Sequence, residues 1–186
     1  DMYDQGKVAV LQGIGYPNPN RSHFRSLDIW HTAEPEKMIS EGWLGKAIRD
    51  LDPNKENILT AVNFGRGLPR ALAASGVSVA SVGDLSNYGV LTGMQGADDR
   101  SEALDIFARM YAPMIGTGPV SDYLSQTGLD ALRGADILSA APQNYSSSVE
   151  YGGSPLAQWI KNIAQVHLAA FGTRILYPRV HPRTFP

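Results

Sequence analysis

The chain has 186 residues, the length of one domain, and 43% of them are hydrophobic, enough to bury roughly 70% of the surface that an unfolded chain exposes. Its formal charge of −2 leaves no surplus of Lys and Arg to collect phosphate groups or anionic lipids, which argues against nucleic acid and membrane as partners. No apolar run reaches the roughly 20 residues that cross a bilayer, and there is no cysteine for a disulfide or a thiolate metal site. Composition therefore predicts a water-soluble α/β chain.

Both ends of the chain resemble interruptions of a larger domain. The first residues, Asp1–Gly6, are typical of the end of a helix or loop, so we expect another element before them. At the other end, Pro178, Pro182 and Pro186 follow the strand-like Thr173–Tyr177, and proline cannot donate to a sheet ladder. We therefore assign residues 1–177 to a partial domain and residues 178–186 to an irregular tail, with a frameshift as one hypothesis for the tail.

The first part of the chain predicts an alternation of strands and helices. Lys7–Gln12 is a short apolar run before Gly13 and Gly15, which favours a buried strand in the middle of a sheet. Apolar spacing then predicts two helices, and β-branched runs bounded by Gly or Pro predict two strands: a helix with Phe24, Leu27 and His31 on its core face, a helix over Glu41–Leu51, and strands over Ile58–Phe64 and Val77–Val82.

The second part predicts three helices and a closing strand. Asp98 is expected to cap a helix that Pro113 ends, and a looser helical pattern covers Tyr123–Leu138. The clearest helix has Ser154 as N-cap and Pro155 at its first position, with Gly172 past its end and an apolar stripe of Leu156, Ile160, Ile163, His167 and Phe171. Because this helix returns to a strand, the fold class is α/β, with a mostly parallel sheet flanked by helices.

Only Gly13–Arg25, between the first predicted strand and the first predicted helix, has a composition that suggests chemistry. Tyr16 and Asn18 each precede a proline, so the loop is stiff up to Asn20, which can cap a helix that begins at Arg21. The loop between a strand and a helix is where open α/β sheets bind ligands, and the start of a helix offers unpaired N–H groups. The segment therefore predicts an oxyanion site.

Six side chains are candidates for this site. Asn18, Asn20, Arg21 and Arg25 are expected to bind a sulfate, phosphate or carboxylate. Ser22 offers a hydroxyl nucleophile, and His23 offers a proton carrier or a metal ligand.

A purely structural interpretation of the same residues stays open. Asn20 then only caps the helix, Ser22 only faces water, and the arginines only pair with Asp28 or Glu34. His31 and His167 lie on apolar stripes and are predicted to be packed core histidines, and Trp30, Trp43 and Trp159 to be core aromatics.

A dinucleotide site is excluded. The strand that ends at Gly13 and Gly15 has Asn18 in place of the third glycine, and Pro17 and Pro19 occupy the turn that should wrap a pyrophosphate.

Gly13–Ala33 strongly resembles the bacterial domain-of-unknown-function 1501 family. Supporting features follow in the family's order: Glu41–Gly45, Gly67–Ala71, and the helix from Leu156 to Phe171 with its Gly172–Ile175 exit. The resemblance covers nearly everything up to Tyr177 and implies a partial alkaline-phosphatase/sulfatase-like sheet. It also implies a bacterial protein exported through the twin-arginine route to the periplasm or the extracellular space.

In that superfamily a nucleophile lies at a helix start beside divalent metals held by Asp and His. The Asn20–Arg25 helix start resembles that place, but the register sets Pro17 or Asn18 opposite the nucleophile, so Ser22 is the candidate by proximity only. The family's flanking Asp-Gly, Phe-Asp-Thr-His and His-Gly metal motifs are not in this sequence.

The expected function is therefore a part of a secreted, metal-dependent hydrolase of sulfate or phosphate esters. The divalent metal is expected in the parent protein and not on this chain, which is expected to be inactive alone. The alternative is a non-catalytic secreted module that binds an acidic glycan or a protein partner. The expected ligand is the anionic group of a small-molecule or glycan ester.

Overall fold

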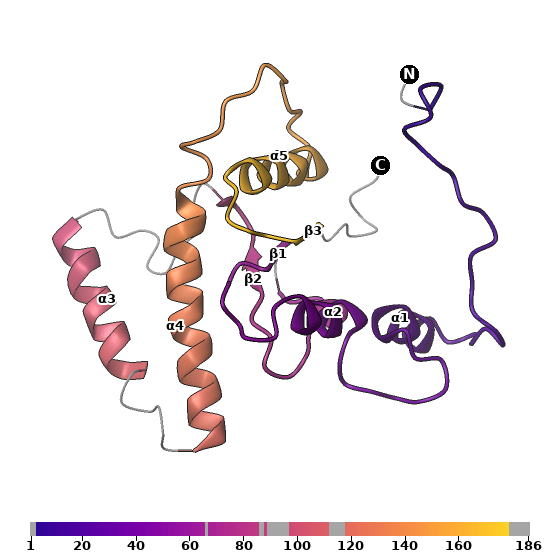
Figure 1. The fold of residues 1–186 in the computed structure, drawn as a ribbon, viewed down its shortest axis with the longest axis horizontal. Coiled ribbons are helices and arrows are strands. Elements are labelled where there is room, and N and C mark those ends of the chain that lie inside the picture. The colour runs from indigo at the N-terminus through magenta and orange to yellow at the C-terminus, as the bar shows by residue number, and fades with distance from the viewer. Residues whose placement is uncertain (1–2, 66, 86–87, 89–96, 112–117, 179–186) are drawn as a thin grey trace.

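The computed structural model of the chain describes residues 3–65, 67–85, 88, 97–111 and 118–178. The described residues form helices and three strands, and the strands make one parallel sheet flanked by helices, so the predicted α/β class is confirmed (Figure 1). The elements are α1 (His23–Thr32), α2 (Trp43–Leu51), β1 (Ala61–Phe64), the short 3-10 helix η1 (Arg70–Leu72), β2 (Ala80–Val82), α3 (Ala97–Tyr111), α4 (Pro119–Ser139), α5 (Pro155–Leu168) and β3 (Ile175–Pro178).

The sheet has the strand order β2-β1-β3, and β1 is its central strand. Val62 is aligned with Ala80 of β2 and with Leu176 of β3, and both pairings are parallel. Every residue of β1 is buried, as expected of a parallel strand that is covered on both faces. The three predicted strands Ile58–Phe64, Val77–Val82 and Thr173–Tyr177 are thus confirmed, each with a shorter ladder than the sequence predicts.

The two faces of β1 belong to different parts of the core. Val62 and Phe64 pack with residues of α4 and α5, among them Leu138 and Val166, into the larger apolar cluster. Ala61 points to the other face and packs with Ile48 of α2 and Leu72 of η1. Figure 1 accordingly shows α5 on one side of the strands and α2 on the other.

Helix α5 begins as its sequence predicts. The Ser154 hydroxyl accepts a hydrogen bond from the Ala157 N–H at 3.2 Å, and Pro155 is the first helical residue. Its buried polar side chains are Asn162 and Gln165, while His167 is exposed, so the prediction of a core histidine at that position is wrong. Ile163 and Phe171 of the predicted apolar stripe pack against the core, whereas Ile160 is half exposed, so the stripe is confirmed in part.

Pro178 is the last residue of β3, inside the segment that the sequence assigns to the tail. Ile175 donates its N–H to Thr60 next to β1, and because neighbouring residues of a strand point to opposite sides, the nitrogen of Pro178 faces away from β1. An edge strand tolerates proline in that position, because no ladder bond is lost. Residues 179–186, including Pro182 and Pro186, lie outside the described residues, as does Pro113.

The predicted strand Lys7–Gln12 is wrong. These residues have no strand conformation, are exposed, and follow a course that leads away from the sheet (Figure 1). Helix α1, which the sequence places beside the sheet, packs instead against η1 and α2. Gly13–Arg25 is therefore not at the crevice of the sheet where the sequence analysis places it.

Helix α1 is confirmed, but the face that it buries is not the predicted one. Phe24 and Leu27 are 90% and 56% exposed, whereas Asp28, Ile29 and Thr32 are buried. Trp30 and Trp43 are also about half exposed, which corrects their interpretation as core aromatics. Trp159 does pack against the main cluster, and His31 is half-buried.

The remaining helices match their predictions in place. Helix α2 covers Trp43–Leu51 and α4 covers Pro119–Ser139, two and four residues from the predicted starts. Asp98 is the second residue of α3 and not its cap. None of the helices among the described residues is long and apolar enough to cross a bilayer.

Candidate anion-binding site at the start of α1

Tyr16 joins the loop before α1 to the side of that helix by a hydrogen bond and a ring contact. The Tyr16 hydroxyl accepts the N–H of Asn20 at 3.1 Å and shares a hydrogen bond of 3.0 Å with the Ser26 hydroxyl. The Tyr16 ring meets the edge of Trp30, with 6.3 Å between ring centroids. The hydrogen bonds from Ser26 and Asn20 lower the pKa of Tyr16 by favouring its charged form. These contacts set the direction in which the chain enters α1.

The N-cap of α1 is Ser22 and not Asn20. The Ser22 hydroxyl accepts the N–H of Arg25 at 3.4 Å, and the Asn20 side-chain oxygen accepts the N–H of Ser22 at 2.8 Å. Asn20 thus closes a local turn before the helix, as short polar side chains often do. Two N–H groups that the sequence analysis expects to be available to an anion are therefore paired with the chain's own side chains.

Arg25 does not face the start of the helix. Its guanidinium group binds Asp28 at 3.2 Å and donates to three backbone carbonyl oxygens 3.0 to 3.3 Å away, those of Glu34, Pro35 and Lys37. The role of Arg25 in an anion site is thereby corrected, because its donors are already used. Its position one turn into the helix places it beside Asp28 at i+3 and over the loop that follows α1.

Asp28 connects this arginine to a second one. Arg70, in η1, pairs with the other oxygen of Asp28 and donates to the carbonyl oxygen of Ile39. Asp28 is only 8% exposed. The pairing of an arginine with Asp28, which the sequence analysis gives as the structural alternative, is thus confirmed.

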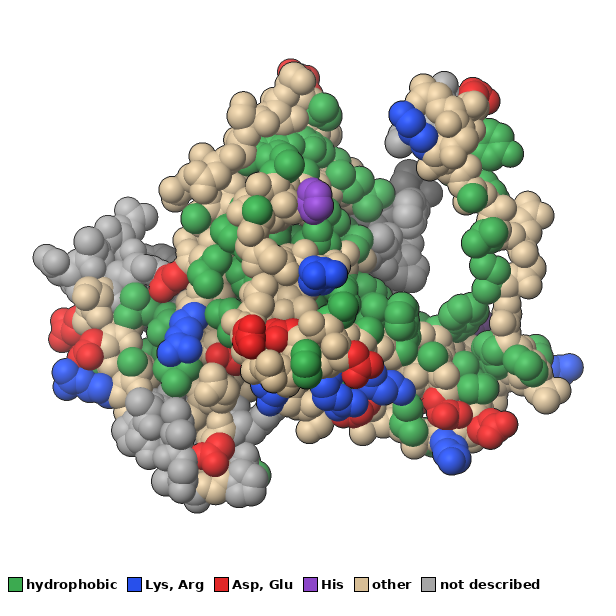
Figure 2. Space-filling view, viewed as in Figure 1, with side chains coloured by type: hydrophobic (Ala, Val, Ile, Leu, Met, Phe, Trp, Pro, Cys, Tyr) green, Lys and Arg blue, Asp and Glu red, His purple; other side chains and the backbone are tan. Residues whose placement is uncertain are grey.

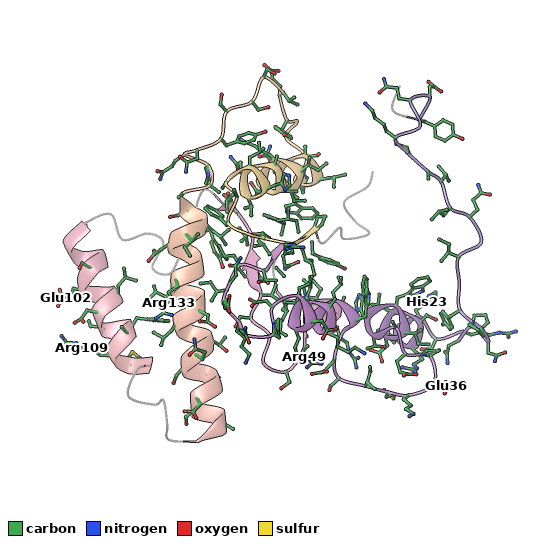
Figure 3. All side chains as sticks on the ribbon, in the orientation of Figure 1. His23, Glu36, Arg49, Glu102, Arg109 and Arg133 are labelled. Atoms are coloured by element: carbon green, nitrogen blue, oxygen red, sulfur yellow. The ribbon has the colours of Figure 1, made fainter. Side chains whose placement is uncertain are left out.

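The groups that remain for an anion are few and exposed. Arg21 and His23 are exposed, and neither has a hydrogen-bond or ion-pair partner among the described residues. The backbone N–H groups of His23 and Phe24 likewise have no partner within the part of the chain that the structure describes. Figure 3 shows His23 at the outer end of α1. Asn18 is exposed in a left-handed turn with φ 54°.

The predicted nucleophile has no base beside it. No hydrogen bond links Ser22 to His23 or to any carboxylate among the described residues, so nothing there accepts the hydroxyl proton. Within the described ranges, no three His, Cys, Asp or Glu side chains come together as a metal site. The residues described around α1 therefore do not fit the divalent metal that the family resemblance implies, and we derive no chemical step through one.

A separate cavity of about 380 Å³ lies among α2, α4 and the loops that precede β1 and β2. Two carboxylates in its lining already accept hydrogen bonds. Asp52 accepts them from backbone N–H groups of its own loop, and Asp130 accepts them from the side chains of Ser78 and Gln126. The N–H groups of Asn57 and Glu56 lower the pKa of Asp52. Sequence reasoning missed this cavity, because its lining comes from segments far apart in the chain and no local motif marks it.

No protein-family model, no curated protein and no solved structure matches the chain. The resemblance to the domain-of-unknown-function 1501 family therefore stays a prediction from the residues quoted for it.

Proposed function

We propose that the start of α1 binds the anionic group of a sulfate or phosphate ester, in a small molecule or a glycan, without catalysing its hydrolysis. The observation that supports this proposal is that Arg21, next to the N-cap Ser22, has no side-chain partner among the described residues, and that the N–H groups of His23 and Phe24 are also unpaired there. A helix N-terminus holds about half a positive charge, and no acidic residue lies in the first turn of α1 to neutralise it.

The expected affinity is low, because every contributing group is exposed. A helix terminus contributes about 0.3–1 kcal/mol and an exposed ion pair about 0–1 kcal/mol. A dissociation constant of about 1 mM already corresponds to about −4 kcal/mol, so we expect millimolar binding or weaker. Because salt screens exposed charges, the binding should weaken as ionic strength rises.

The test is a titration of the isotope-labelled chain with inorganic sulfate, followed by the amide resonances of His23 and Phe24 at low salt. Both resonances should move, and Arg21→Gln should weaken the binding several-fold. Arg25→Gln is the matched control, because it removes the same charge four residues further along the chain, from a guanidinium that is already paired. Equal losses in both variants, or resonances that stay fixed, would overturn the proposal.

Ester hydrolysis is the second candidate function, and the Gly13–Ala33 motif is what favours it. In this proposal the chain is part of a secreted, metal-dependent hydrolase of the periplasm or the extracellular space. Ser22 would be its nucleophile at the helix start. Because Ser22 has no base among the described residues, we expect the chain alone to be inactive.

This expectation is tested with p-nitrophenyl sulfate and p-nitrophenyl phosphate, each in the presence of zinc, calcium or magnesium. No turnover above the buffer rate is expected. Turnover that Ser22→Ala abolishes would refute the non-catalytic proposal in favour of hydrolysis.

A further inference from the structure

The sheet has a free edge at β3. Ile175 donates its N–H to the Thr60 carbonyl next to β1, so Leu176, the next residue, points its N–H and C=O away from β1. The C=O of Pro178 points the same way. Among the described residues, β3 pairs with β1 alone, so its outer edge offers one donor and two acceptors to a further strand.

Lys7–Gln12 has the composition of a strand that is covered on both faces. Val8 and Val10 alternate with Ala9 and Leu11, so an extended chain would point apolar side chains to both sides. In the structure this segment lies apart from the sheet, and Val10 and Leu11 are 68% and 76% exposed (Figure 1). Its backbone N–H groups have no partner within the part of the chain that the structure describes.

The hand of the connections selects β3 over β2 as the edge for this segment. The connection from β1 through η1 to β2 runs over the face of the sheet that α2 covers, because Leu72 packs with Ala61 and Ile48. The connection from Lys7–Gln12 through α1 and α2 to β1 would run over the same face. Two connections on one face have the same hand only if they step in the same direction, and such connections are right-handed in about 98% of cases. A strand before α1 therefore belongs on the β3 side of β1.

The helices beside this edge leave apolar side chains uncovered on both faces of the sheet. Helix α5 packs on β3, and its Ile160 is still 49% exposed. On the other face, α1 exposes Phe24 and Leu27 at 90% and 56%. Figure 2 shows hydrophobic side chains over α1 and along the segment before it. A strand that is apolar on both sides needs a cover on each face, and each of these helices has apolar side chains for one.

The connection to α1 is long enough for such a strand. Residues 13–22, ten in number, separate the segment from α1 and span about 33 Å when extended. Helix α1 contacts α2, and α2 packs in one cluster with Ile175 of β3, so two packing layers of about 10 Å each separate α1 from β3. The move puts the two hydrogen bonds of Tyr16 at risk, whereas the edge of β3 offers three.

We propose that Lys7–Gln12 moves between the exposed position that the structure shows and a docked position, in which it adds to the outer edge of β3 as a fourth, parallel strand. The docked sheet has the order β2-β1-β3 followed by Lys7–Gln12. Docking buries the apolar side chains of the segment between α1 and α5 and pairs backbone groups of both strands. The segment is then an edge strand, and not the middle strand that the sequence analysis predicts.

The test is hydrogen exchange of single backbone amides, followed by NMR in the isotope-labelled intact chain. In the docked position, the Leu176 N–H and every second N–H of Lys7–Gln12 donate to the new ladder. These amides should exchange slower than in an unfolded chain by about tenfold or more. Exchange of the whole segment at the rate of an unfolded chain would overturn the proposal.

The double variant Ala9→Pro/Val10→Pro removes one ladder donor in either register, because neighbouring residues point to opposite sides. It should raise the Leu176 exchange rate by about tenfold and leave that of Ile175, which donates towards β1, unchanged. Ala9→Ser/Val10→Thr is the matched control, because it changes the same two side chains and keeps both N–H groups, so Leu176 should remain slow. Equal Leu176 rates in the wild-type chain and the proline variant would contradict docking.

The concentration of the chain shows whether the docked strand comes from the same molecule. Exchange rates of Leu176 at about 50 and 500 μM should agree, because docking within one chain does not depend on concentration. A rate that rises on dilution would show that the strand comes from a second copy, which would also overturn the proposal.

Discussion

Asp28→Asn removes the charge that connects α1 to η1. The Asp28 carboxylate is 8% exposed and pairs with two guanidinium groups, one from its own helix and one from Arg70, 42 residues further along the chain. Asparagine keeps the shape of the side chain and one acceptor, so the substitution tests charge and not volume. The two arginines keep their backbone acceptors but lose the anion between them.

The expected loss follows from how much water reaches each cation. Breaking a fully buried ion pair by removing one partner costs about 3–5 kcal/mol, because a charge stays buried without compensation. The Arg70 side chain is 39% exposed and Arg25 keeps three carbonyl acceptors, so both cations are partly compensated after the substitution. We therefore expect Asp28→Asn to lower the free energy of unfolding by about 2–3 kcal/mol.

Urea unfolding followed by tryptophan fluorescence measures this loss. Asp105→Asn is the matched control, because Asp105 pairs with Arg109 on α3 while their side chains are 56% and 77% exposed. A pair of that kind contributes about 0.3–0.5 kcal/mol. A loss below about 1 kcal/mol, the most that an exposed pair contributes, or a loss no larger than that of Asp105→Asn, would show that Asp28 stabilises the fold no more than an exposed ion pair does.

Two further predictions concern a close approach and an acid-sensitive loop. Gly45→Ala should lower the free energy of urea unfolding by about 1–3 kcal/mol despite the better helix propensity of alanine, because the new Cβ would lie 2.7 Å from the Cβ of Ala74. In the control Gly153→Ala the new Cβ meets nothing within 4 Å, so the free energy of unfolding should change by less than about 0.5 kcal/mol. Asp52 has a lowered pKa in the folded chain, so its contribution to stability is complete above its unfolded pKa of about 4 and is lost as the pH falls through the folded pKa. Urea midpoints measured from pH 7 to pH 3 should therefore fall less for Asp52→Asn than for the wild-type chain. Equal decreases in the two proteins would contradict this expectation.

Local signals in the sequence were sufficient where one segment determines its own structure. Ser154 and Pro155 predict the start of α5 to the residue, because capping depends on neighbours within one turn. The strands β1 and β2 were found because runs rich in β-branched residues between Gly or Pro favour strand conformation. The parallel architecture was predicted because a helix that returns to a strand, as α5 returns to β3, is typical of parallel sheets.

The environment of α1 could not be predicted in this way. The stripe of Phe24 and Leu27 predicts a buried face, but the charge pair of Asp28 with Arg70 holds the opposite face against η1. That pair joins residues 42 positions apart, and no periodicity within either segment indicates it. The same limit applies to the cavity near Asp52, whose lining comes from segments far apart in the chain.

The Lys7–Gln12 segment shows a different limit. Its apolar pattern is that of a strand, and the pattern fails because a strand needs a partner as well as a composition. The ladders formed by the described residues join only β2, β1 and β3. Lys7–Gln12 is therefore exposed, although its composition favours a buried strand.

These observations separate the chemistry of the α1 start from its packing. Arg25 contributes its charge to the fold through Asp28, and Ser22 contributes its hydroxyl to the helix cap, so neither needs a ligand to explain its position. Arg21 has no such structural partner among the described residues, and its exposure costs the fold nothing. The two arginines therefore distinguish a binding site from a helix start that is only capped. Arg21→Gln should weaken sulfate binding and leave the free energy of unfolding unchanged. Arg25→Gln should lower the free energy of unfolding and leave sulfate binding unchanged.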